Sequence, residues 1–315
     1  MSTGRGADRM KVLFAAPARL WDTWAPALRA ACPEMDLRRD GDPAGFDALI
    51  YAPGYPEDGT MLDFSPFIRA RLVQSLWAGV ERIVTNPTLT QPLCRMVDPG
   101  LAQGMVEYCS GWALRAHLGM DRHAQDGVWR NHLTPPLAAG RGVTVLGMGE
   151  LGRAVSLALA SFGFRVTGWS NSGRAVPGIA VLPGASLPEA LRRAEILVGL
   201  LPDTAETRGL LDAGRLALLP RGATIINAGR GTLIDEPALI AALDRDPEAR
   251  AVLDVFRTEP LPPDHPFWRH PQVTVTPHVA AETRPASAAP VAAENLRRAM
   301  RGQPLLHLVD RARGY

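Results

Sequence analysis

Short apolar runs alternate along the chain with segments of helical periodicity. Residues 11 to 16 (KVLFAA) are typical of a buried strand, and residues 24 to 32 (WAPALRAAC) have the spacing of an amphipathic helix. Apolar runs at residues 46 to 52 and 81 to 86 continue the series as further strands, with turn residues and helical stretches between them. This alternation predicts an α/β fold, in which helices connect parallel strands.

A second series of the same kind begins near Gly142. Its six strand candidates are GVTVLG (142 to 147), FRVTGW (164 to 169), ILVGLL (196 to 201), ATIINAG (223 to 229), AVLDVF (251 to 256) and the buried-looking VTVTP (273 to 277). Helical segments such as residues 150 to 163 lie between them. Six strands with helical crossovers predict a doubly wound parallel sheet.

Two domains are expected, because 315 residues exceed the size at which one hydrophobic core usually keeps growing. A long helical pattern begins near residues 98 to 102, and a helix after Thr283 is expected to return the chain to the first domain. We therefore expect two Rossmann-like domains with an active-site cleft between them. Residues 1 to 100 and 285 to 315 would form a discontinuous substrate-binding (catalytic) domain, and residues 101 to 284 an NAD(P)-binding domain.

Composition narrows the class of partner. Hydrophobic residues make up 46% and charged residues 21%, and no run of eighteen apolar residues could span a bilayer. The formal net charge is +2, and the basic residues are scattered, so charge favours neither nucleic acid nor a membrane surface. We expect a soluble protein whose partner is a small molecule.

Lysine and cysteine usage excludes several chemistries. Lys11 is the only lysine, which argues against Schiff-base catalysis and a phosphate-binding P-loop. Cys32, Cys94 and Cys109 are widely spaced without a CxxC pair, so we expect neither disulfides nor a zinc site, and a cytoplasmic location fits. The polar residues 1 to 9 are expected to be a leader without function.

Residues 143 to 152 (VTVLGMGELG) carry a GxGxxG motif directly after an apolar strand and directly before a helical pattern. Gly147 allows a tight turn, Gly149 lets a pyrophosphate approach the backbone, and Gly152 lets helix and strand pack closely. The phosphate would meet free N–H groups at the helix N-terminus. A glycine-rich turn without a ligand is the alternative, and its place at the head of six strand candidates disfavours that alternative.

The end of the next strand should carry an acid if the cofactor is NAD, because a carboxylate there binds the ribose 2′-OH. This position is Ser170, and no acid occurs between Trp169 and Arg174. Hydroxyl, amide and guanidinium groups can donate hydrogen bonds to a 2′-phosphate, so NADP(H) is favoured over NAD(H). The donors are Ser170, Asn171, Ser172 and Arg174, although Arg174 could also be a solvated loop residue.

Three strand ends supply polar groups that could converge beyond the sheet: Arg230, Glu259 and His278. A histidine is suited to protonate the oxygen left negative by hydride addition to a carbonyl, and a carboxylate would orient that histidine. The planar fork of Arg230 can bind an α-keto acid, and Pro277 would hold the turn that aims His278. Singly, each residue could be a loop cap or a solvated charge, but their joint placement favours catalysis.

The ordered motifs GMGELG, LLPDTAETRGLL, NAGRGTLIDEPALIAALD and LDVFRTEPLPPDHPFWRHPQVTVTPHVA resemble the D-isomer-specific 2-hydroxyacid dehydrogenases over residues 142 to 284. Trp169 with Ser170, and the stretch ending in TPHVAAETRP, are most similar to the branch of NADPH-preferring glyoxylate and hydroxypyruvate reductases. That branch often has a basic residue where this chain has Asn171, and Arg174 lies close enough in sequence to substitute.

The resemblance implies that Arg230, Glu259 and His278 are catalytic, that a loop including Pro53, Gly54 and Tyr55 binds the substrate with Arg230, and that the protein is a homodimer. The expected cofactor-binding residues are Gly147, Met148, Gly149, Glu150, Leu151, Gly152, Ser170, Asn171, Ser172, Arg174, Leu201, Pro202, Ala228, Gly229 and Asp254, with Asp254 at the nicotinamide end.

We therefore expect NADPH-dependent reduction of glyoxylate or hydroxypyruvate, with His278 as general acid. Two alternatives stay open: an NAD-dependent dehydrogenase of a larger D-2-hydroxy acid, and a nucleotide-binding regulator without turnover. His265 and His270 are interpreted as loop residues. The remaining histidines lack partners at ligand spacing, so no metal is expected; they are His117, His123, His132 and His307.

Overall fold

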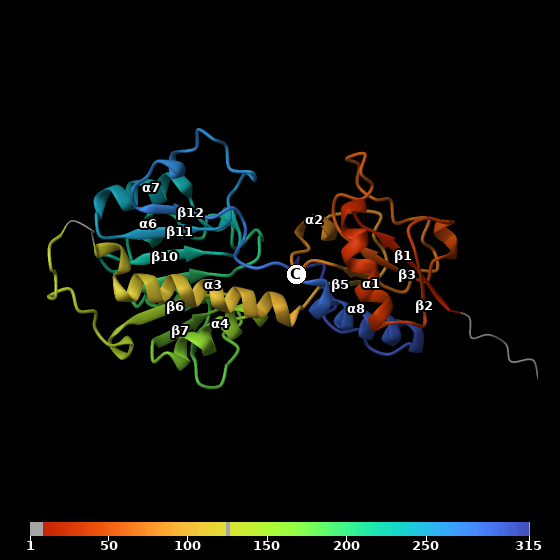
Figure 1. Ribbon diagram of the computed structural model, residues 1–315, viewed down its shortest axis with the longest axis horizontal. Coiled ribbons are helices and arrows are strands. Elements are labelled where there is room, and N and C mark those ends of the chain that lie inside the picture. Colours follow the sequence, from red (N-terminus) through yellow and green to blue (C-terminus); the bar gives the residue numbers. More distant parts are fainter. Residues whose placement is uncertain (1–8, 124–126, 315) are drawn as a thin grey trace, which may run out of the picture. The chain divides into compact units, whose positions relative to one another are not determined.

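The computed structural model describes residues 9–123 and 127–314, and the chain divides into two compact units that are each described by themselves (Figure 1). Unit 1 is Met1–Leu101 with Thr283–Tyr315, and unit 2 is Ala102–Glu282. The expected leader, residues 1 to 9, lies outside the described residues except for Arg9. Which unit binds substrate and which binds cofactor stays a prediction at this point.

Unit 1 contains a five-stranded parallel sheet in the order β2-β1-β3-β4-β5. Its strands are β1 (Met10–Ala15), β2 (Met35–Arg38), β3 (Ala48–Tyr51), β4 (Val73–Ser75) and β5 (Leu93–Cys94), and its helices are α1 (Trp21–Ala31), α2 (Glu81–Val84) and α8 (Pro285–Arg301). Helices α1 and α8 lie side by side on one face of this sheet (Figure 1). Phe64, Ile83 and Leu89 belong to the core on the other face.

The C-terminal helix α8 is fixed to the first part of the chain by a buried amide. Asn295 donates to the side chain of Gln74 in β4 (2.8 Å) and exchanges hydrogen bonds with the backbone of Leu306. Small residues such as Ala288 and Ala292 let α8 pack closely on the sheet. Helix α8 therefore packs within unit 1, against the first part of the chain.

One expectation for unit 1 is wrong, and three strands were not expected. Residues 81 to 86 do not form a strand, because Glu81–Val84 is one turn of helix, α2, that buries Ile83. Strands β2, β4 and β5 have four, three and two residues, too few for a clear alternation of apolar and polar positions.

Unit 2 contains a seven-stranded parallel sheet in the order β12-β11-β10-β9-β6-β7-β8. The strands are β6 (Gly142–Leu146), β7 (Arg165–Trp169), β8 (Ala180–Leu182), β9 (Ile196–Gly199), β10 (Thr224–Asn227), β11 (Arg250–Leu253) and β12 (Val273–Val275). The helices are α3 (Pro99–Leu118), whose first residues belong to unit 1, α4 (Glu150–Ser161), α5 (Leu187–Arg192), α6 (Ala213–Leu216) and α7 (Glu236–Arg245).

Alternate residues of the central strands point to opposite faces of this sheet. Val143 and Val145 pack with α3 and α4, whereas Leu146 and Leu197 pack with α5, α6 and α7. The strand order reverses between β6 and β9, and ligands of such sheets bind beyond the carboxyl ends of the strands at this point. The predicted doubly wound α/β architecture is confirmed.

Two details of unit 2 differ from expectation. A seventh strand, β8, pairs with β7 at the sheet edge, and its three residues carry no readable periodicity. Strand β12 is only half-buried, since it pairs with β11 alone at the other edge. No helix in residues 9–123 and 127–314 is long and apolar enough to cross a membrane.

Candidate active site

The glycine loop joins β6 to α4 where the strand order reverses. Gly147 has φ of 101°, and its N–H donates to the carbonyl of Trp169 at the end of β7 (2.8 Å). A Cβ atom at Gly152 would overlap the carbonyl oxygen of Gly147, so only glycine lets α4 start this close to the loop. A Cβ at Gly149, the N-cap residue of α4, would meet no atom within 4 Å. The loop therefore leaves room for a phosphate above Gly149.

The other residues of the glycine loop have different surroundings. Met148 packs against β7, where a Cβ at Gly168 would overlap the methionine side chain. Glu150 and Leu151 form the first turn of α4, and the carboxylate of Glu150 lies 3.9 Å from the guanidinium of Arg153. An acid in this turn favours the helix but opposes an anion at the same N-terminus.

The loop after β7 forms a tight turn with hydroxyl groups. The oxygen of Ser172 accepts a hydrogen bond from the N–H of Arg174 (3.3 Å) and lies 3.5 Å from the hydroxyl of Ser170. Asn171, Ser172 and Arg174 are exposed, and Gly173 has φ of 59°. The loop thus presents neutral and basic groups to solvent.

The ends of β9 and β10 pack against each other through their backbones. A Cβ at Gly229 would lie 2.9 Å from the carbonyl oxygen of Leu201, so the backbone at Ala228 and Gly229 packs directly against the backbone at Leu201 and Pro202. Thr207 donates to the carbonyl of Pro202 (2.6 Å) and fixes the loop after β9. These four predicted cofactor residues therefore lie at one edge of the sheet.

Arg230 lies in a turn that polar groups hold in place. The buried side chain of Asn227 donates to the carbonyl of Arg230 (3.0 Å) and accepts from the N–H of Gly229 (3.3 Å). The guanidinium of Arg230 donates to the carbonyl of Gly229 (2.8 Å). Contacts within the protein thus hold the conformation of this turn.

Glu259 and His278 form a direct pair. Oε2 of Glu259 lies 2.8 Å from Nδ1 of His278, while Oε1 accepts from the N–H of Phe256 (2.9 Å). An ionised carboxylate can only accept, so Nδ1 carries the proton in this pair, and Nε2 is the nitrogen that can exchange a proton with a ligand. The carboxylate thus sets both the tautomer and the orientation of the imidazole.

The three predicted catalytic residues follow three adjacent parallel strands. Arg230 comes after β10, Glu259 after β11 and His278 after β12, so their turns share one edge of the sheet. A Cβ at Gly231 would overlap the backbone of Phe256, which shows that the Arg230 turn packs on the segment leading to Glu259.

The remaining predicted residues are Asp254 and the loop from Pro53 to Tyr55. The carboxylate of Asp254 is buried under the segment that carries His278, and its expected contact with nicotinamide stays a prediction. Pro53, Gly54 and Tyr55 follow β3 in unit 1, where Gly54 has φ of 94°, and their role with substrate likewise stays a prediction.

Two histidines outside the pair, His265 and His270, stabilise a loop. His265 and His270 each accept a backbone N–H within the loop around the 3-10 helix Pro266–Trp268, from Phe267 and Gln272, which agrees with their interpretation as loop residues. In the described part of the chain, no group of three or more His, Cys, Asp or Glu side chains could hold a metal ion.

Comparison with known proteins shows which family this chain belongs to. A family model for the NAD binding domain of D-isomer specific 2-hydroxyacid dehydrogenases matches residues 112–280. The glyoxylate/hydroxypyruvate reductase A of Serratia proteamaculans is 36% identical, over 97% of this chain and all of the relative. This chain belongs to the D-isomer specific 2-hydroxyacid dehydrogenase family.

Solved structures of this family agree over almost the whole chain. A dehydrogenase from Xanthobacter autotrophicus Py2 in complex with NADPH and MES has a TM-score of 0.89 and 39% identity, covering 98% of this chain and 100% of that one. An NADPH-dependent glyoxylate/hydroxypyruvate reductase from Sinorhizobium meliloti in complex with NADP and sulfate has a TM-score of 0.85 and 34% identity, covering 97% and 99%. The predicted family is confirmed, and the protein is an oxidoreductase.

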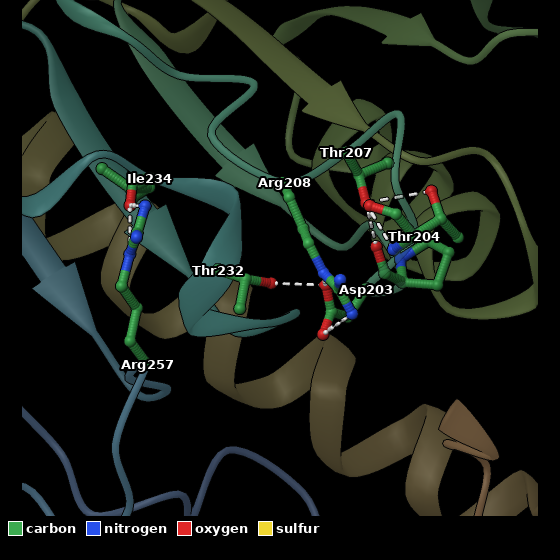
Figure 2. A network of polar contacts seen from close by, with 8 residues as sticks. Asp203, Thr204, Thr207, Arg208, Thr232, Ile234 and Arg257 are labelled. Atoms are coloured by element: carbon green, nitrogen blue, oxygen red, sulfur yellow. Dashed lines mark hydrogen bonds and ion pairs between the residues drawn. The ribbon is translucent and has the colours of Figure 1, made fainter. Parts of the chain in front are cut away.

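A polar network beside the site in this dehydrogenase was not predicted from the sequence (Figure 2). The carboxylate of Asp203 accepts from Arg208 (2.7 Å) and from the hydroxyl of Thr232 (2.9 Å), and Arg257 donates to the carbonyl of Ile234 (3.1 Å). Burial opposes ionisation of Asp203, but the two donors hold the pKa of its carboxyl below the usual range. The network ties the turn after Arg230 to the loops after β9 and β11.

Proposed function

We propose that this protein reduces a small 2-keto acid, glyoxylate or hydroxypyruvate, to the 2-hydroxy acid with NADPH. The observation that carries the proposal is the Glu259 to His278 pair, 2.8 Å apart, on the same sheet edge as the glycine loop. The curated relative from Serratia is named for these two substrates, and the Sinorhizobium structure contains NADP.

The residues present fit a bound dinucleotide. Gly147, Gly149 and the first turn of α4 would hold the pyrophosphate, because the space above Gly149 is open and helix N–H groups face it. Ser170, Ser172 and the exposed Arg174 would bind the 2′-phosphate, where an acid would repel it. When bound, NADPH supplies the hydride.

The side chains of the pair then have defined tasks. His278 holds a proton on Nε2 and transfers it to the substrate carbonyl oxygen as negative charge develops there. Glu259 keeps Nδ1 protonated and stabilises the imidazolium form. Arg230 offers two parallel N–H groups to the substrate carboxylate and polarises the neighbouring carbonyl. Pro53, Gly54 and Tyr55 would add backbone N–H groups to that carboxylate.

We also propose a cytoplasmic homodimer. The chain between α3 and β6 exposes the large apolar side chains of Met120, Val128, Trp129 and Leu137, and such groups are typical of surfaces that another protein covers. The buried, free thiols of the three cysteines agree with a reducing compartment.

The test is the loss of reduced-nicotinamide absorbance, with NADPH and NADH run in parallel against glyoxylate, hydroxypyruvate, pyruvate and a larger 2-keto acid. We expect NADPH with the first two substrates to be fastest, and His278→Ala to lower kcat about 10²- to 10⁴-fold without loss of cofactor binding. Preference for NADH and the larger acid would support the NAD-dependent alternative, and NADPH binding without turnover would support the regulator.

A further inference from the structure

His278 holds a backbone conformation that histidine rarely adopts. Its φ is 54°, and His278 and His307 are the only non-glycine residues with positive φ in residues 9–123 and 127–314. A strained conformation of this kind persists only where the surrounding structure enforces it, and it often marks a functional site. The side chain at this position is the proposed proton donor, so the groups that enforce the conformation also aim the imidazole.

Asp254 provides the enforcing contacts. Its backbone carbonyl accepts the N–H of His278 (2.9 Å). Its carboxylate accepts the next two N–H groups, with Oδ1 to Val279 and Oδ2 to Ala280, both at 2.9 Å. Three consecutive N–H groups therefore converge on one residue that is almost completely buried.

The carboxylate of Asp254 is itself held by a chain of hydroxyl groups that reaches α3. Thr276 donates to Oδ1 of Asp254 (2.6 Å), and the oxygen of Thr276 lies 2.6 Å from the phenol oxygen of Tyr108. A carboxylate only accepts, so the proton of Thr276 is used on Asp254, and Tyr108 must donate to Thr276. Burial raises the pKa of Tyr108, which keeps this donor protonated throughout the working pH range.

We propose that Tyr108 and Thr276 are positioning residues for His278, acting through Asp254. Tyr108 donates a hydrogen bond to Thr276, and Thr276 donates one to Asp254, which fixes the Asp254 carboxylate that accepts the N–H groups of Val279 and Ala280. Helix α3 thereby influences the direction of the imidazole from a position outside the Glu259 to His278 pair, because Tyr108 contacts Thr276. The catalytic part of this inference rests on the proposed function.

Isosteric substitutions separate this role from simple packing. Tyr108→Phe removes one hydroxyl, and Thr276→Val removes the donor to Asp254 while keeping the shape of the side chain. Thr276→Ser restores the hydroxyl. Ser110→Ala is the matched control, because the Ser110 hydroxyl is buried on the same helix without a hydrogen-bond partner in the described structure.

The first readout is steady-state kinetics on glyoxylate with NADPH. We expect kcat to fall about 10-fold in Tyr108→Phe and about 100-fold in Thr276→Val, with KM changed less than about 2-fold, because misaligned proton donation affects the transition state more than binding. The solvent deuterium isotope effect on kcat should rise in both variants, which a loss of folded protein would not cause. Thr276→Ser should recover most of the wild-type kcat.

The second readout does not need turnover. Hydrogen exchange of the peptide containing Val279 and Ala280 should be about 10-fold faster in Tyr108→Phe than in Ser110→Ala, because the acceptor of both N–H groups is less firmly held. If wild-type protein reduces glyoxylate, kinetics like those of Ser110→Ala overturn the inference. If wild-type protein is inactive, the proposed function fails, and the hydrogen-exchange result alone tests the positioning role. Unchanged protection of the Val279 and Ala280 amides in Tyr108→Phe would then overturn that role, and lost protection would support it.

Discussion

The substitution Gly231→Ala tests whether the Arg230 turn and the Glu259 segment form one rigid assembly. A Cβ at Gly231 would lie closer than 3.0 Å to Cα, C and O of Phe256. These atoms belong to the backbone, so no side-chain rotation can relieve the overlap. The two segments must therefore separate, and they carry Arg230 on one side and the Glu259 to His278 pair on the other.

The size of the effect follows from how far the segments must move. Ordinary van der Waals contact begins near 3.4 Å, so the segments must part by more than about 1 Å. Overpacking a core usually costs about 1 to 3 kcal/mol, and a backbone overlap should lie at or above the upper end of that range. A displacement of about 1 Å at a reacting group can lower turnover about 10²-fold.

The assay is urea unfolding together with kcat and KM for glyoxylate. We expect Gly231→Ala to lose about 3 kcal/mol or more of unfolding free energy and about 10²-fold in kcat/KM. Gly111→Ala is the control, because a Cβ there meets no atom within 4 Å, and alanine in the middle of α3 should stabilise the protein by about 0.5 to 1 kcal/mol. Wild-type stability and activity in Gly231→Ala would refute the close packing of the two turns.

Two further predictions concern the cofactor and pH. Ser170→Asp should lower kcat/KM for NADPH at least about 10-fold and raise kcat/KM for NADH, because a carboxylate repels the 2′-phosphate and accepts a hydrogen bond from the 2′-OH. Parallel assays with both cofactors check this. An unchanged ratio of the two kcat/KM values would remove Ser170 from the cofactor site. Burial, aided by the nearby Arg141, lowers the pKa of His117 below its ordinary value of 6.5. The unfolded chain then binds the proton more readily than the folded protein does, so stability should fall as pH drops below about 6.5. Between about pH 7.5 and 5, Tm should therefore fall less in His117→Phe than in the wild-type protein. Equal slopes of Tm against pH in the two proteins would contradict the prediction.

The architecture was predictable where the chain repeats a strong local pattern. Strands β6, β9 and β10 are buried along their whole length, and their apolar runs predict them directly. Strand β8 has three residues of mixed exposure, and α2 is a single turn, so local sequence contains too little signal for either element. Pairing with β7 and burial of Ile83, respectively, determine these elements in the folded protein.

The candidate site divides in the same way. Gly147, Arg230 and His278 follow predicted strands, so their positions at the sheet edge can be derived from the sequence. Gly231 is different, because its importance depends on Phe256, which is distant in sequence and adjacent only after folding. Tyr108 meets Thr276 across 168 positions of the chain, and a tyrosine in a helix gives no local sign of such a partner. Sequence therefore predicts which groups are present at the site more readily than what holds them in position.

The turns that carry the proposed catalytic side chains are held by contacts within the protein. The proposed catalytic side chains Arg230, Glu259 and His278 project from turns, and each turn is fixed by backbone or buried polar contacts rather than by the substrate. Preorganised groups act in the transition state without reorganisation, which is the main advantage of building them on rigid elements. We therefore expect the hydroxyl of Tyr108 on α3, and the absence of a side chain at Gly231, to affect turnover although neither position touches the reacting atoms.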